Sequence, residues 1–232
     1  MTHPQGEPTA GTSGRKRDPH GTRDRLVRAA LELFTTQGYH ASTTPEIAAK
    51  AGVAEGTIYR HFASKEQLLN EIYRAGVRVF VNIVREQPAA LPCAERLQRM
   101  AAGWRDIAVR NPALVRLVFV SRIRTLLDAR SRDAAKELRG EVEQLIASGK
   151  AAGHVRPGAV DVWADIWLGV IGLMLERVAN KEWAPEQAGP RLAVESAWAA
   201  IAAPGAPPGS PLSAPSPTSP PAAPPPGPPP AG

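Results

Sequence analysis

Residues 43–62 read TTPEIAAKAGVAEGTIYRHF, and this stretch decides the fold of the first part of the chain. Thr44 followed by proline is typical of a helix start, because the hydroxyl can cap free backbone N–H groups and proline costs nothing in the first turn. Gly52 stands where this short helix must end, since glycine readily adopts the left-handed conformation that turns the chain sharply. A second short helix follows, anchored by Ile58 and Phe62. The stretch therefore predicts a tight helix-turn-helix.

Helical periodicity continues on both sides of this stretch. On the N-terminal side, Leu26, Ala30, Leu33 and Phe34 fall on one helix face. Most of the remaining chain repeats apolar residues at helical spacing, with no convincing alternation of β-branched residues, so the sequence predicts an all-α fold. We expect helices at residues 22–37, 45–51, 54–61, 65–86, 93–110, 113–121, 123–149, 160–180 and 188–202.

The helix expected at 54–61 leaves most of its side chains available to a partner. Gly56 inside it costs on the order of 1 kcal/mol relative to alanine, which suggests that another molecule, DNA in the first place, approaches the backbone there. Residues 64–67 (SKEQ) then match a capping box that begins a long helix. Its positive dipole end and Lys65 would suit a phosphate.

The ordered set of short motifs between residues 29 and 66 resembles the TetR family of bacterial regulators. It comprises Ala29-Ala30-Leu31-Glu32-Leu33-Phe34, Gly38-Tyr39, Thr43-Thr44, Ile47-Ala48, Ala51-Gly52-Val53, Gly56-Thr57-Ile58-Tyr59-Arg60-His61-Phe62 and Ser64-Lys65-Glu66. The resemblance covers about a fifth of the chain, and the rest agrees only in length and helicity.

The resemblance implies roles for nine residues in DNA binding. Thr43 and Thr44 would hold phosphates at the start of the second helix. Four residues would face base edges in the major groove: Glu55, Gly56, Thr57 and Arg60. The DNA backbone would be gripped by Tyr59, His61 and Lys65. Phosphate contacts of this kind set position and salt dependence, whereas contacts to base edges set sequence preference.

Two residues depart from the family's usual pattern. Ala54 stands where many members have serine, which removes a possible helix cap, and Glu55 stands where many have lysine, which puts an anion toward DNA. Affinity would then depend more on a basic arm, in which Arg15–Arg17 either reach a phosphate or the minor groove or remain a solvated charged tail.

The charge of the chain agrees with a polyanionic partner. The formal net charge is +6 and the pI about 9.9. Six cations between Arg15 and Arg28 stand against two aspartates, so four of the six net charges lie near one end. Such an arm favours nucleic acid or an acidic membrane surface.

Several classes of protein are disfavoured. Cys93 is the single cysteine, which excludes an intramolecular disulfide and fits a reducing compartment. We see no secretory segment, and the longest strongly apolar run, 166–175, is about half of the roughly 20 residues that span a membrane; we therefore expect a cytoplasmic protein. No metal-binding, phosphate-loop or nucleophile pattern is present, and Asp161 with Asp165 on one helix face favours capping and solvation, so we expect neither an enzyme nor a cofactor or metal.

We expect four parts: a flexible basic arm (1–20), the helix-turn-helix domain (21–69), a helical ligand-binding and dimerisation domain (70–203) and a tail (204–232). In the tail 14 of 29 residues are proline and none is charged. It is either a docking sequence for a proline-binding partner or an unstructured extension, and we favour the extension.

The third part suggests two surfaces. The resemblance implies a sensor domain, and apolar residues that could line its pocket, or simply form core, are Trp104, Ile107, Leu114, Phe119, Ile123, Trp167 and Ile171. The helix at 160–180 is apolar nearly all round, and the last helix offers more apolar side chains. These two helices would pair with their twins in a homodimer through Ile166, Val170, Leu173, Trp198 and Ile201.

These observations predict a DNA-binding transcription regulator, foremost a repressor that a small, largely apolar effector releases from a palindromic operator on double-stranded DNA. The alternatives are an activator or corepressor-dependent regulator of the same fold, and a sequence-independent DNA-binding or membrane-surface protein.

Overall fold

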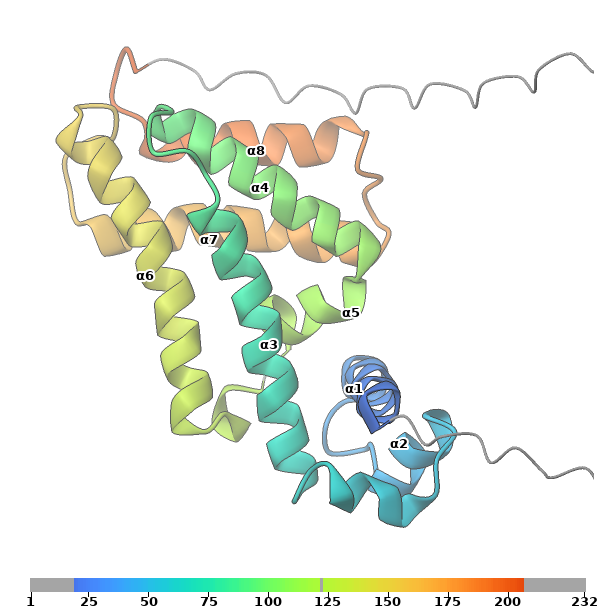
Figure 1. Cartoon of the computed structure of the whole chain (residues 1–232). Coiled ribbons are helices and arrows are strands. Elements are labelled where there is room, and N and C mark those ends of the chain that lie inside the picture. The colour runs from blue at the N-terminus through green and yellow to red at the C-terminus, as the bar shows by residue number, and fades with distance from the viewer. Residues whose placement is uncertain (1–18, 122, 207–232) are drawn as a thin grey trace, which may run out of the picture. The chain divides into compact units, whose positions relative to one another are not determined.

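The computed structural model describes residues 19–121 and 123–206, and helices dominate this part of the chain (Figure 1). The expected basic arm and most of the expected proline-rich tail lie outside the described residues. Within them there is no strand, only an isolated antiparallel bridge between Val155 and Ala202. The all-α prediction is confirmed. The described residues hold no helix long and apolar enough to cross a membrane, and no cluster of residues that could bind a metal ion.

The chain forms two compact units that do not follow chain order. Unit 1 comprises the residues up to Val79 together with Ala113–Glu137, and unit 2 comprises Phe80–Pro112 with the residues from Leu138 onward. The division expected at residue 69 does not coincide with a boundary between these units.

Unit 1 contains the segments around the helix-turn-helix. They are α1 (Pro19–Thr36), α2 (Thr44–Lys50), the 3-10 helix η1 (Glu55–Arg60) and the first part of α3 (Lys65–Arg85), followed in the second stretch by α5 (Pro112–Val115, whose first residue belongs to unit 2), η2 (Arg116–Val120), η3 (Arg124–Leu126) and the start of α6 (Ala129–Ala151). The helix α1 packs on α2, and α2 packs on η1. Their shared core includes Leu26, Phe34, Ile47, Ile58 and Phe62, each at most 4% exposed.

Unit 2 is a layered arrangement of α4 (Cys93–Arg110), α7 (Val160–Ala179) and α8 (Ala188–Ile201), together with the ends of α3 and α6. The helices α7 and α8 lie side by side, and α4 packs on both of them (Figure 1). Trp104 fills the centre, where its ring meets those of Phe80 and Trp167 edge to face, with centroids 5.7 and 6.0 Å away. Its indole N–H donates to the Phe80 carbonyl at 3.2 Å. This aromatic cluster closes the core of unit 2.

The two helices expected at residues 113–121 and 123–149 differ from the structure. Residues 113–121 are not a regular α-helix, because α5 passes into a π-helical turn in which Ser121 N–H donates to the Arg116 carbonyl at 2.7 Å. The helix expected to begin at residue 123 begins at Ala129 instead. The buried Asn70 side chain explains this start, since it donates to the Leu126 carbonyl and accepts from the Asp128 N–H, which holds that segment outside the helix. Asp128 then accepts from the Ser131 N–H at 2.7 Å and caps α6.

Candidate nucleic-acid interface

The turn between α2 and η1 has the geometry that the sequence predicts. Gly52 adopts a left-handed conformation, with φ of +66°. Its N–H donates to Ala49 and that of Val53 to Ala48, both at 3.0 Å, which is the pair of bonds that ends a helix in a Schellman motif. Gly38, with φ of +92°, similarly turns the chain after α1.

The start of α2 differs from the prediction in the residue that caps it. Thr43, not Thr44, is the cap: its hydroxyl accepts from the Glu46 N–H at 3.4 Å, and its own N–H donates to the Glu46 carboxylate at 2.8 Å. The hydroxyl also donates to that carboxylate at 2.9 Å. Since these groups of Thr43 are engaged within the chain, the expected phosphate contact from Thr43 has no free donor to rest on. The pattern Thr-x-x-Glu at 43–46 was the signal for this capping box.

Because Thr43 caps α2, the Thr44 hydroxyl is available for another contact, which it makes with Tyr59. This hydroxyl lies 3.0 Å from the Tyr59 hydroxyl, which joins the first turn of α2 to η1. The Tyr59 side chain is 55% exposed, so this tyrosine is not part of the core. The pair places two hydroxyl groups together at the surface.

The segment expected as an α-helix at 54–61 is a 3-10 helix, η1. Its cap residue Ala54 makes no side-chain hydrogen bond, and Gly56 disfavours a regular α-helix, so the sequence does little to stabilise an α-helix over a 3-10 helix here. Ile58 is 2% exposed and fixes one face of η1 in the core. Glu55, Gly56 and Arg60 are exposed, and Thr57 and His61 are half-buried. A Cβ at Gly56 would meet nothing within 4 Å, so packing inside the chain does not require glycine there.

Lys65 does not present its charge outward in the way the prediction requires. Its ammonium donates to the carbonyls of Tyr39 and Ser42, each at 2.7 Å, and lies 4.2 Å from the centre of the Tyr39 ring. Burial lowers the pKa of this ammonium, opposed by the nearby Glu46 carboxylate. Lys65 thus ties the start of α3 to the loop before α2, because two carbonyls compete successfully with solvent for its donors.

The capping box expected at 64–67 is only half formed. Ser64 Oγ accepts from the Gln67 N–H at 3.0 Å, but the Gln67 side chain accepts from the Ala63 N–H rather than from that of Ser64. A second contact, from α1, also holds α3. The Arg23 guanidinium pairs with the Glu71 carboxylate of α3 and lies 5.1 Å from the centre of the Phe62 ring. Nothing in the local sequence around Arg23 indicates this role, in which Arg23 and Lys65 together fix α3 against the helix-turn-helix.

The residues expected to bind a ligand or a second subunit are distributed differently. Trp104, Trp167 and Ile171 are at most 1% exposed in the core of unit 2, and Ile107 is half-buried there. Phe119, Ile123 and Leu114 belong to unit 1. Of the expected dimer contacts, Ile166 and Leu173 are exposed and Val170 is half-buried. The prediction is wrong for Trp198 and Ile201, because their side chains are only 6% and 0% exposed and α8 packs on α7 and α4 of the same chain.

The fold and the exposed segment define the class: an all-α protein with an N-terminal helix-turn-helix. Residues 26–72 match the family model described as bacterial regulatory proteins, tetR family. The regulator TcmR of Streptomyces glaucescens is 37% identical over 100 residues, which are 43% of each chain. The transcriptional repressor KstR2 of Rhodococcus jostii is 40% identical over 74 residues, 32% of this chain and 33% of that protein.

A solved structure from Shewanella sp. PV-4, described as a tetR family transcription regulator, superposes with a TM-score of 0.65 at 25% identity. The match covers 78% of this chain and 98% of that one. The chain spans less than half the length of the curated relatives it matches. The helix-turn-helix segment is thus similar to that of the tetR family of bacterial regulatory proteins, and the fold is similar to that of a solved structure described as a member of this family.

Proposed function

We propose that this chain is a sequence-specific DNA-binding transcription regulator that reads the major groove with η1. The observation that carries the proposal is the contrast within η1, where Ile58 is anchored in the core while Glu55, Gly56 and Arg60 face solvent. The open space around Gly56 lets a DNA backbone or base edge approach closely.

The exposed side chains have the chemistry for two kinds of contact. Arg60 would pair with guanine, and Glu55 would accept from a cytosine amine, with Thr57 beside them. The hydroxyl pair of Thr44 and Tyr59, together with His61, would contact the DNA backbone. We assign no DNA contact to Thr43 or Lys65, because both are engaged within the chain.

We further propose that the protein acts as a homodimer through one face of α7 and α8. Large apolar side chains stand exposed on these helices: Val162, Ile166, Leu173 and Leu192, between 38% and 51%. A second copy would cover them, and two reading segments would then meet the half-sites of a palindrome. Leu173→Glu should dissociate the dimer in analytical ultracentrifugation, whereas Val109→Glu, at an equally exposed valine on α4, should not. A wild-type chain that sediments as a monomer would refute this proposal.

The sense of regulation that we propose is repression, relieved in the cytoplasm by a small, largely apolar effector. The relative KstR2, named a transcriptional repressor, supports this sense, and activation or corepressor dependence would be the alternative. The sensor would be the aromatic core around Trp104 and Trp167. All five tryptophans of the chain lie in unit 2, so an effector that enters this core should change the tryptophan fluorescence while it releases DNA.

The test is selection of a binding sequence from random duplex DNA, followed by fluorescence anisotropy at several salt concentrations. A regulator should prefer the selected palindrome by a factor of at least about a thousand. Tyr59→Phe should weaken binding to all sequences alike, whereas Arg60→Ala should relax the preference at one base pair by about 1–3 kcal/mol. Equal affinity for every duplex would establish a sequence-independent DNA-binding protein and overturn the proposal.

A further inference from the structure

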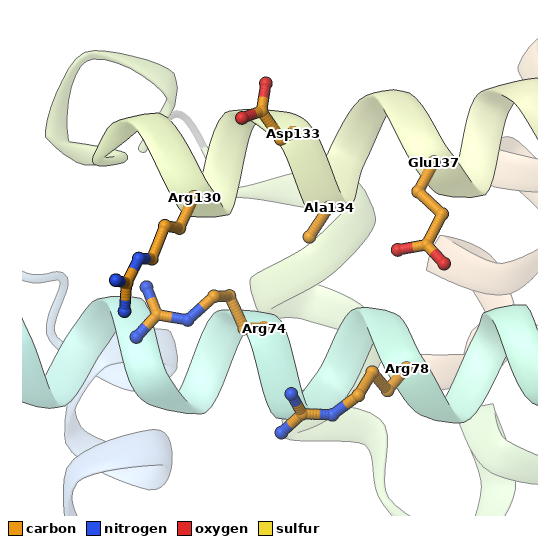
Figure 2. A pocket seen from close by; sticks show the side chains of 6 residues that line it. All are labelled: Arg74, Arg78, Arg130, Asp133, Ala134 and Glu137. Carbon is orange, nitrogen blue, oxygen red and sulfur yellow. The ribbon is translucent and has the colours of Figure 1, made fainter.

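A hollow of about 330 Å³ lies in unit 1, between α3 and the first turns of α6 (Figure 2). Three arginines line it, with two acidic residues and one alanine: Arg74, Arg78, Arg130, Asp133, Ala134 and Glu137. None of the DNA-contacting residues proposed above lies in this hollow, which is therefore a separate feature.

The positive charge is concentrated at one end of the hollow. In Figure 2 the Arg130 guanidinium extends from α6 toward that of Arg74 on α3, while Asp133 points away from α3. The Asp133 carboxylate is paired instead with Lys136, at 3.3 Å. The carboxylates that line the hollow therefore do not stand between these two guanidiniums.

The arginines differ in how far their charge is compensated. Arg74 donates to the Asp128 carboxylate at 2.9 Å and to the Ser131 hydroxyl at 3.0 Å. The side chains of Arg78 and Arg130 make no hydrogen bond or ion pair with any residue in the ranges 19–121 and 123–206. Arg78 follows Arg74 by one helical turn, so both line the same side of the hollow.

Guanidinium groups placed together repel one another unless an anion lies between them, and their planar donors match phosphate oxygens two at a time. We propose that this hollow binds a small phosphate-bearing anion, held between Arg74 and Arg130 and reached by Arg78.

The size and position of the hollow favour a small solute over DNA or a lipid. Its volume is at the lower end of the range for small-molecule sites. Arg74 is nine residues beyond Lys65, about 14 Å along α3 from the end that adjoins the helix-turn-helix. Ala134 is the one apolar side chain of the lining, so nothing there would insert into a lipid layer.

Isothermal titration calorimetry of the full chain with sodium pyrophosphate tests the proposal without DNA, so its result is independent of the proposed regulator function. We expect one site per chain with Kd tighter than about 1 mM. Arg130→Ala and Arg78→Ala should each weaken binding at least about tenfold. Lys136→Ala is the matched control, since it removes one cation from α6 outside the hollow, and it should leave Kd within about twofold.

Arg78 and Arg130 are exposed and make no contact that the fold needs, so circular dichroism should show both variants folded. No heat of binding, or an equal loss in the Lys136→Ala variant, would overturn the proposal. Titration with citrate separates phosphate from carboxylate recognition: we expect weaker binding of citrate, and citrate binding without pyrophosphate binding would also overturn it.

Discussion

The replacement Lys65→Met separates two roles for this lysine, a brace inside the protein and a contact to DNA phosphate. Methionine keeps an unbranched stem of similar length but removes the ammonium that donates to Tyr39 and Ser42. Hydrogen bonds from a charged donor contribute about 1.5–3 kcal/mol each, and a cation near an exposed ring adds up to about 1 kcal/mol. Because lost contacts are partly replaced by water, we expect a net loss of about 2–4 kcal/mol in the free energy of unfolding of unit 1.

The assay is urea unfolding followed by far-ultraviolet circular dichroism, together with amide hydrogen exchange read from peptides that cover residues 39–47. Tryptophan fluorescence would not serve, since every tryptophan lies in unit 2. Exchange in these peptides should accelerate in Lys65→Met. Lys50→Met is the control: Lys50 pairs with Glu32 at 2.8 Å on the surface, and its loss should cost less than about 1 kcal/mol.

DNA binding gives an independent measurement of the same role. Affinity for DNA falls as the salt concentration rises, and removal of a lysine that contacts a phosphate reduces the steepness of log affinity against log salt by about 0.9. A brace changes affinity and leaves that slope unaltered, and we expect this second outcome. Unchanged urea unfolding and exchange, combined with a reduced salt slope, would refute the brace and restore Lys65 as a phosphate contact.

Three further outcomes follow from packing and titration. Gly149→Ala should lower the stability of unit 2 by about 1–3 kcal/mol, because a Cβ there would meet Cys93 Sγ at 2.5 Å. Gly140→Ala in the same helix has open space and should raise the stability by up to about 1 kcal/mol. Unfolding in urea, followed by tryptophan fluorescence, compares the two variants. Burial raises the pKa of the Cys93 thiol to about 11, so at pH 8 iodoacetamide should modify the folded chain far more slowly than the unfolded chain, and equal rates would show that the thiol is accessible. Burial alone would raise the pKa of Asp128, but hydrogen bonds from Ser131 and Arg74 outweigh this effect and hold the pKa below its usual 3.8. The resulting stability is present above pH 3.8 and is lost as the pH falls through the pKa of the folded state. Asp128→Asn should therefore reduce the loss of stability at acid pH, and an unaltered loss would contradict this assignment.

The helix-turn-helix was accessible from sequence because its signals are local. Gly52 fulfils a backbone requirement that only its neighbours in sequence impose, and Ile58 is buried as its spacing predicts. The start of α6 was not accessible in this way. Its position depends on Asn70, which contacts Leu126 and Asp128 more than fifty residues further along the chain.

The same distinction explains why the surroundings of some predicted site residues differ from what the sequence suggests. A lysine after a capping box predicts an exposed cation when only its own helix is considered, but the partners of Lys65 lie 23 and 26 residues earlier in the chain. Trp198 and Ile201 have the apolar spacing of a dimer face. When two neighbouring helices are apolar on both sides, however, spacing alone does not tell which side packs within the subunit and which meets a partner. The hollow between α3 and α6 arises similarly. Arg74 and Arg130 are more than fifty residues apart in the chain, with α4, α5, η2 and η3 between them, so only the folded chain reveals that their charges share one end of the hollow.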